Sequence, residues 1–208
     1  MISHIRKYFP SLTEEQIARF ETLMKAYPEW NDKINVISRK DIDNLEVNHI
    51  LHSLAIARLI QFAPGSRVLD FGAGGGFPSL PLAVLFPDVQ FHLVDRVGKK
   101  LRVAEDVARQ AGLTNVTVQH GDIGECRDKF DFVVSRAVMP LPDLVRLSSK
   151  NISEKQVNAM PNGFITLKGG ELQGEIAATP GTTELFDIAR WFSDEDFFKT
   201  KKVTYTFL

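Results

Sequence analysis

The sequence predicts an α/β fold, built on a mainly parallel sheet with helices on both faces. Two observations lead to this prediction. From residue 67 onward, short apolar segments of strand length alternate with segments of helix length, and parallel strands require crossovers of that kind. A glycine-rich turn directly follows the first apolar segment, which is typical of the strand-to-helix turns of this fold class.

The first sixty or so residues are expected to be helical. A capping-box pattern begins at Thr13, and apolar residues then recur along one helix face. Pro28 is expected to kink or end that helix. A second helix is expected over residues 41–60. We therefore predict a helical N-terminal cap, residues 1–62, on a core that spans residues 63–208.

The remaining elements follow at regular intervals along the core. In order, they are a strand at 67–71, a helix at 77–86, a strand at 89–95, a helix at 98–112, strands at 115–121 and 130–137, a helix at 142–158, a strand at 163–170 and a closing β pair at 184–192 and 201–208. Right-handed crossovers would bring the carboxyl ends of the parallel strands to one edge of the sheet. We expect the functional residues in the loops at that edge.

Composition excludes several classes of protein. The 208 residues carry 25 Lys and Arg against 26 Asp and Glu, a net charge of −1, which argues against a polybasic protein but leaves local basic patches open. Cys126 is the single cysteine, so we expect neither an internal disulfide nor a Cys-rich zinc site, and a reducing cytoplasm is the expected compartment. No apolar stretch approaches the ~20 residues needed to span a bilayer, so no membrane partner is expected.

The strongest motif is the glycine loop DFGAGGGF at residues 70–77. Gly72, Gly74 and Gly76 let the backbone turn sharply and approach a ligand closely at a helix N-terminus. The spacing is GxGxG, and the third glycine of a dinucleotide-binding GxGxxG would fall at Phe77. This spacing makes a dinucleotide a poor match.

Two carboxylates near this loop suggest a different cofactor. Asp70 lies at the end of its strand, where it would repel a pyrophosphate but suit a cofactor that carries an ammonium and a sulfonium. Asp95 ends the second strand and could accept hydrogen bonds from a ribose diol. Together they favour S-adenosylmethionine over NAD. The alternative is that the glycines form only a tight turn, with Asp70 and Asp95 as helix caps.

At this point a family resemblance is clear over nearly the whole chain. The sequence resembles the bacterial small-subunit ribosomal RNA guanine-N7 methyltransferases, also called the glucose-inhibited division protein B family. The segments that carry the resemblance are EWNDKINVIS (29–38), NHILHSLAI (48–56), RVLDFGAGGGFPSLPLAVLFPD (67–88), LVDRVGKKLRV (93–103), FDFVVSRAV (130–138) and ITLKGGEL (165–172).

The resemblance implies a Rossmann-like, S-adenosylmethionine-dependent methyltransferase sheet under the helical N-terminal cap. It implies methyl transfer to N7 of a guanine in 16S ribosomal RNA, with either the RNA or the assembled small subunit as the partner. Family cofactor contacts fall on the positions that match Gly72, Phe77, Ile123, Gly124 and Arg136.

Guanine N7 chemistry fits what the chain has and lacks. The N7 lone pair is free at neutral pH, so positioning can carry the catalysis without a general base. Cys126 has no partner motif and is interpreted as inert, which disfavours a cysteine-nucleophile route. His49 and His52 lack a third ligand nearby in the sequence, so no metal site is expected.

Arg136 and Lys168 are the candidate catalytic cations. Arg136 could bind the cofactor carboxylate, the guanine O6 or a phosphate, and Lys168 could hold a phosphate or the target base. The alternative for each is a surface cation or a structural salt bridge.

Two other functions remain open at this stage. One is methylation of a small molecule, with the helical cap as a lid. The other is a dinucleotide-binding domain, against which the Asp70 position and Phe77 argue. We expect a cytoplasmic monomer.

Overall fold

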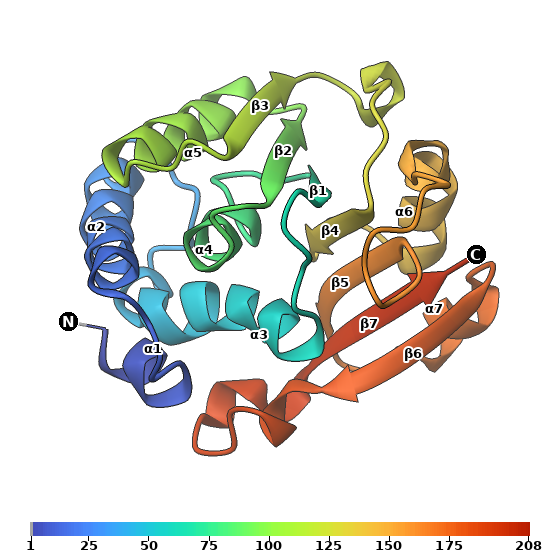
Figure 1. Ribbon diagram of the computed structural model, residues 1–208. Helices are drawn as coiled ribbons and strands as arrows, with labels where there is room; N and C mark the ends of the chain where they lie inside the picture. Colours follow the sequence, from blue (N-terminus) through green and yellow to red (C-terminus); the bar gives the residue numbers. More distant parts are fainter. Residues whose placement is uncertain (1) are drawn as a thin grey trace.

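The computed structural model describes residues 2–208 and is built on one seven-stranded sheet (Figure 1). The helices are α1 (Ser3–Tyr8), α2 (Glu14–Asn31), α3 (His52–Leu59), α4 (Ser79–Leu85), α5 (Gly98–Gln110), α6 (Leu141–Ser148) and α7 (Gln173–Ala178). The strands are β1 (Arg67–Phe71), β2 (Gln90–Asp95), β3 (Val116–His120), β4 (Phe132–Arg136), β5 (Gly163–Gly169), β6 (Thr182–Asp187) and β7 (Lys201–Phe207).

The strand order is β3-β2-β1-β4-β5-β7-β6, and every pair from β3 to β5 is parallel. Strand β7 runs antiparallel to both of its neighbours. The chain leaves β1 toward β2 on one side and returns to β4 on the other, so the order reverses between β1 and β4. In open α/β sheets, ligands bind at the carboxyl ends of the strands at such a reversal. The predicted α/β fold class is confirmed.

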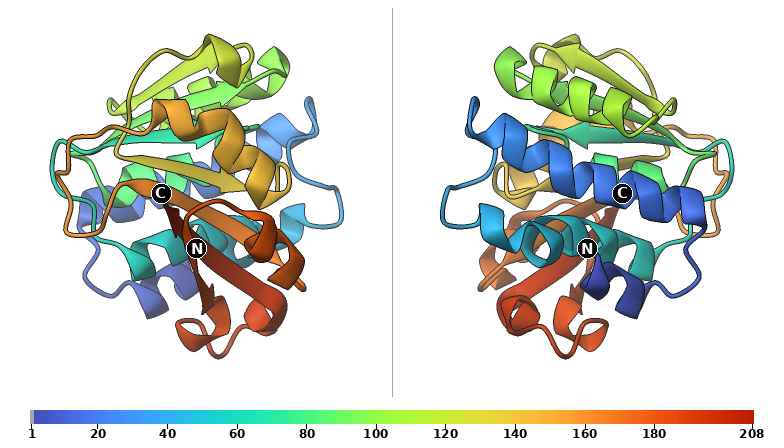
Figure 2. Two further views of the ribbon diagram at one scale, coloured as in Figure 1. Left: turned by 90° about the vertical axis from the view of Figure 1, so that its right-hand side faces the viewer. Right: turned by 90° about the vertical axis from the view of Figure 1, so that its left-hand side faces the viewer.

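Helices cover the two faces of the sheet unequally (Figure 2). Helices α2, α3, α4 and α5 pack on one face in a large apolar cluster that includes Val68, Phe132 and Val134. Helix α6 packs on the other face in a smaller cluster that includes Leu69 and Val133. Successive residues of one strand therefore enter different cores, as the two-residue period of a strand requires.

The N-terminal helices belong to the larger apolar cluster. Phe20, Leu23 and Tyr27 of α2 are fully buried in the same cluster as the sheet residues. Residues 2–62 are thus packed continuously onto the face of the core, and the boundary after residue 62 stays a prediction. No helix within residues 2–208 combines the length and apolar character needed to cross a membrane.

The sequence predicted that Pro28 would kink or end α2, and the helix does not end there. The helix begins at the Thr13 capping box, as predicted, and continues through Pro28 to Asn31. The lost backbone donor lies in the last turn, where the carbonyl of Pro28 still accepts a hydrogen bond from Asp32. Trp30 also anchors this turn through a hydrogen bond of 2.8 Å from its Nε1 to the Asp106 carboxylate on α5. Tertiary contacts therefore outweigh the local cost of the proline.

Three other boundaries also differ from the prediction. Residues 41–60 form three consecutive helical segments, a 3-10 turn at Ile42–Asn44, a π-helix at Leu45–Leu51 and then α3. The helix predicted at 142–158 ends early, because the buried Asn151 side chain donates hydrogen bonds to the carbonyls of Cys126 and Asp128. The closing β pair is present, but β6 ends at Asp187 rather than at residue 192.

Candidate active site

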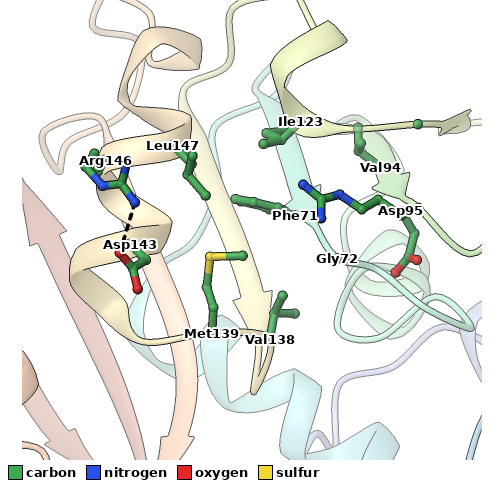
Figure 3. Close-up of a pocket in the computed structure, with 12 residues that line it drawn as sticks. Phe71, Gly72, Val94, Asp95, Ile123, Val138, Met139, Asp143, Arg146 and Leu147 are labelled. Carbon is green, nitrogen blue, oxygen red and sulfur yellow. Dashed lines mark hydrogen bonds and ion pairs between the residues drawn. The ribbon is translucent and has the colours of Figure 1, made fainter.

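A cavity of about 520 Å³ opens at the carboxyl edge of the sheet, next to the reversal between β1 and β4. The residues that line it come from the ends of four strands and from α6 (Figure 3). They are Phe71, Gly72, Val94, Asp95, Arg96, Gly121, Ile123, Val138, Met139, Asp143, Arg146 and Leu147. Its size falls within the range of about 300–1,000 Å³ that is typical of small-molecule sites.

The glycine loop forms one rim of this cavity. Gly72 has a φ of +74°, and a Cβ on it would lie 2.6 Å from the Val138 side chain. Only glycine fits both the left-handed backbone and this close approach. The cap supports the loop from the other side, because the Tyr27 hydroxyl donates a 2.8 Å hydrogen bond to the Gly75 carbonyl. A Cβ on Gly75 would in turn lie 2.9 Å from Val36.

Asp95 holds the rim in place and also faces the cavity. Its Oδ2 accepts a 2.8 Å hydrogen bond from the Gly74 amide, and its Oδ1 accepts a 2.7 Å bond from the Val97 amide. A carboxylate oxygen has a second lone pair, so each oxygen can still accept a hydrogen bond from a ligand hydroxyl. Gly74 itself does not line the cavity, and its role is to connect the loop to Asp95.

The two positions predicted after β3 separate in the structure. Ile123 is buried and lines the cavity. Gly124 lies outside the lining, where its amide donates to the Asp122 side chain at 2.6 Å and its carbonyl accepts from Lys150 at 2.8 Å.

Arg136 and Phe77 lie on the other face of the sheet, toward the cap. The Arg136 guanidinium stands 4.7 Å from the centroid of the Phe77 ring, and that ring stacks on Tyr27 at 4.5 Å. His49 approaches the same ring at 5.5 Å and is paired with Asp41 through a 2.6 Å contact. We name Asp41, His49, Asp70, Phe77 and Arg136 the cap-side cluster.

Burial shifts the pKa values of the cap-side cluster. It lowers the pKa of Arg136 to about 10, despite the opposing attraction of Tyr27, Asp70 and Asp41. Burial and the Arg136 charge lower the pKa of His49 to about 4, so its imidazole is neutral near pH 7. The ring keeps an unpartnered Nδ1. Strongly shifted groups beside a binding edge are typical of functional sites.

Asp70 is fully buried and does not line the cavity. Its Oδ2 accepts a 3.1 Å hydrogen bond from the Ser79 amide at the start of α4, and its Oδ1 has no partner. Burial raises its pKa to about 7, partly offset by the Ser79 hydrogen bonds. In this structure its side chain therefore caps a helix, which is the alternative that the sequence left open.

Lys168 and Arg136 lie on opposite faces of the sheet, although their strands are adjacent. Phe132 and Val134 face the larger core, so Arg136 continues that face of β4. Lys168 continues the face of β5 that carries Phe164, in the smaller core. The two candidate catalytic cations thus occupy opposite faces of the sheet, and Lys168 forms a salt bridge of 2.7 Å with Glu175.

The sequence reasoning missed much of the cavity wall. Val138 and Met139 follow β4, and Arg146 and Leu147 project from α6. In Figure 3, Met139 and Leu147 lie on the α6 side of Phe71, and a dashed line joins Arg146 to Asp143. The ion pair between Arg146 and Asp143 measures 3.1 Å. The place of Val138 and Met139 directly after a parallel strand was the available signal. Among residues 2–208, no three His, Cys, Asp or Glu side chains are grouped to hold a metal ion.

Comparison with known proteins identifies the family. Residues 16–189 match the GidB family, described as rRNA small subunit methyltransferase G. The chain belongs to this family. It is 58% identical to ribosomal RNA small subunit methyltransferase G of Bacteroides thetaiotaomicron, over 97% of this chain and 98% of that protein. It is 54% identical to the protein of the same name from Porphyromonas gingivalis, over 97% of this chain and 91% of that protein. The predicted family is therefore confirmed.

Solved structures agree with the fold. The precorrin-6y C5,15-methyltransferase of Geobacter metallireducens is 13% identical, with a TM-score of 0.52 over 74% of this chain and 77% of that one. A fibrillarin/Nop5p complex gives a TM-score of 0.54 at 11% identity, over 74% of this chain and 78% of that one. At such identities the likeness concerns the fold alone, which is the Rossmann-like methyltransferase sheet that the sequence predicted.

Proposed function

We propose that this chain is an enzyme that transfers a methyl group from S-adenosylmethionine to N7 of a guanine in 16S ribosomal RNA. Family membership over nearly the whole length supports the reaction and the RNA. The observation that carries the proposal in the structure is the cavity between the glycine rim and α6, at the reversal of strand order.

The residues of the cavity fit the proposed cofactor. Phe71, Val94, Ile123 and Leu147 offer apolar surface for a flat purine, and Asp95 offers carboxylate oxygens for a ribose diol. Gly72 leaves room at the rim that a side chain would fill. When bound, S-adenosylmethionine supplies an electrophilic methyl group on a sulfonium. The cavity thus supports binding roles for Gly72, Asp95 and Ile123. The family resemblance adds Phe77 and Arg136, which lie outside the cavity lining on the cap side.

The chain's own residues need only position the reactants. Guanine N7 carries a lone pair at neutral pH, so no residue has to remove a proton before attack. Arg136 is a half-buried cation with five donors in a planar fork. It is suited to hold a carboxylate or the O6 and N7 edge of guanine. Phe77 and Tyr27 fix the plane beneath that guanidinium.

Three further assignments complete the proposal. The partner is the small ribosomal subunit or its RNA, the chain acts as a monomer, and the compartment is the cytoplasm. Shape and a few well-placed cations can provide RNA specificity, so the net charge of −1 is compatible with this partner. Light scattering of the purified protein measures the mass that decides the oligomeric state.

The decisive experiment follows tritiated methyl groups from S-adenosylmethionine into small subunits that lack the modification. Borohydride and aniline then cleave the RNA at 7-methylguanosine, and one cleavage site is expected. Arg136→Met should lose the activity. Arg190→Met should retain it, because Arg190 also stands over an aromatic ring, Trp191 at 5.8 Å, but is exposed and lies outside the cavity lining. Methylation of small molecules with no transfer to RNA would contradict the proposal.

A further inference from the structure

Lys168 connects three segments that are separate in the sequence. Its Nζ donates a 2.9 Å hydrogen bond to the Met139 carbonyl and forms a 2.7 Å salt bridge with Oε2 of Glu175 on α7. The same Oε2 accepts a 2.8 Å hydrogen bond from the Leu141 amide. The pair therefore holds the backbone on both sides of Pro140, at the start of α6.

The segment held in this way is a wall of the cavity. We name residues 137–140 the β4–α6 loop. Its Val138 lies against Gly72 at the rim, and both Val138 and Met139 line the cavity. The loop begins at Ala137, which has a φ of +50°. An L-residue in that region is strained, so tertiary contacts must hold the loop in place.

The ion pair between Lys168 and Glu175 is partly shielded from water. The Lys168 side chain is 10% exposed and the Glu175 side chain is 32% exposed, so water screens the attraction less than at an open surface. Partial burial alone would raise the pKa of Glu175, but the hydrogen bonds from Lys168 and Leu141 lower it below its ordinary value. The carboxylate is thus charged at neutral pH, and removal of either partner leaves the other poorly compensated.

We propose that Lys168 and Glu175 are positioning residues, which fix the β4–α6 loop against the glycine rim and thereby set the affinity of the cavity for its ligand. Lys168 then has no contact with the RNA or the reacting methyl group. The assignment rests on the proposed function only for the identity of that ligand, S-adenosylmethionine. We call the contacts of Lys168 and Glu175 with this segment the clamp, and they are present in the ligand-free protein.

The test uses the full chain and four variants. Lys168→Met removes the charge at similar length, Lys168→Arg retains it, and Glu175→Gln keeps an oxygen acceptor without the charge. Arg67→Met is the matched control, because Arg67 also joins a backbone carbonyl, that of Lys129, to a carboxylate, that of Asp128, but at the amino edge of the sheet, away from the loop. Amide hydrogen exchange at Met139 and Leu141 is measured without ligand, and S-adenosylmethionine affinity is measured by calorimetry.

In Lys168→Met, the Leu141 amide hydrogen is expected to exchange at least tenfold faster than in the wild type. Cofactor binding is expected to weaken about tenfold, which corresponds to about 1.4 kcal/mol. Lys168→Arg should retain most of the protection and of the affinity, Glu175→Gln should be intermediate, and Arg67→Met should change neither. With saturating cofactor, kcat of Lys168→Met should stay within about threefold of the wild type, so the loss lies in the cofactor KM.

Two results would overturn the positioning role. One is unchanged exchange at Leu141 in Lys168→Met. The other is a large fall in kcat at saturating cofactor with unchanged cofactor affinity, which would make Lys168 a catalytic residue. A wild-type protein that does not bind S-adenosylmethionine would contradict the proposed function instead, while the exchange measurements would still decide whether the clamp exists.

Discussion

The two sides of the binding edge differ in how they are built. The cavity side, between the glycine rim and α6, is open, and its one lining carboxylate on a strand, Asp95, is satisfied by backbone amides. The cap-side cluster is packed tightly and contains a desolvated arginine, a neutral histidine and a buried carboxyl. The cavity side is therefore defined mainly by its shape, and the cap-side cluster mainly by its buried charged and titratable groups.

This difference separates binding from chemistry. A cavity with satisfied polar groups can hold a ligand without large changes in charge. Buried groups with shifted pKa values cost stability, and proteins retain them chiefly where a reaction or a specific contact needs them. We therefore expect substitutions on the cavity side to change cofactor affinity first, and substitutions in the cap-side cluster to change methyl transfer or the pH dependence of stability.

The largest expected effect is that of Gly72→Ala on the cavity side. A Cβ there lies 2.6 Å from Val138 and the φ is +74°, so the β4–α6 loop must move. Calorimetry should show at least a hundredfold loss of S-adenosylmethionine affinity, about 2.7 kcal/mol. Gly65→Ala is the control, because its φ of +82° is equally strained but nothing lies within 4 Å of the Cβ. It should lose about 1 kcal/mol of stability and bind normally. Equal cofactor affinities in the two variants would contradict the role of Gly72 in forming the binding cavity.

Asp70→Asn tests the electrostatic side through pH. The pKa of Asp70 rises from 3.8 to about 7 on burial, so the folded protein binds more protons than the unfolded chain between these values. Stability contributed by the protonated carboxyl is therefore lost as pH rises through this window. The unfolding free energy of Asp70→Asn minus that of the wild type should grow by roughly 3 kcal/mol from pH 4 to pH 7. Denaturant titrations at several pH values measure it, and a flat difference would contradict the burial of the charge.

Asp95→Asn should have a smaller effect on the cavity side. The amide can no longer accept from both Gly74 and Val97, and it presents a donor toward the ligand. We expect cofactor affinity to fall about tenfold, close to 1.4 kcal/mol. Asp131→Asn is the matched control, since Asp131 accepts from the Arg67 amide at 2.8 Å at the amino edge of the sheet. If both variants bind alike, Asp95 acts only through the fold.

Arg136→Met should have the smallest effect on stability. Burial lowers the pKa of Arg136 to about 10, so its charge is held at a cost. Methionine keeps apolar contact with Phe77 and removes that cost. The unfolding free energy should stay the same or rise by less than about 1 kcal/mol, while methyl transfer is lost. A loss of several kcal/mol in chemical denaturation would mean that Arg136 is structural.

Local patterns predicted the elements and the glycine rim well, because they depend on nearby residues. The capping box at Thr13 and the strand-end position of Asp95 are examples. The failures needed knowledge of the third dimension. Pro28 is tolerated because Trp30 bonds to α5, and Asn151 ends a helix because of carbonyls some twenty residues earlier.

Among the site residues too, some features follow from local sequence and others depend on tertiary contacts. The sequence placed Arg136 and Lys168 at the same edge, but the two-residue period of each strand decides which face each side chain enters. Register between β4 and β5 pairs Arg136 with Leu167, so Lys168 lies on the other face. Whether Asp70 faces a ligand or a helix depends on the Ser79 amide, which no spacing rule reveals.

The contact between Tyr27 and the glycine loop also bears on how relatives can exchange parts. The Tyr27 hydroxyl bonds to the Gly75 carbonyl, and a Cβ on Gly76 would lie 3.1 Å from the same hydroxyl. A chimera that joins this N-terminal segment to another methyltransferase sheet would inherit a tyrosine without its matching turn. The two stretches, some fifty residues apart, therefore have to be inherited together, and recombination between them is constrained.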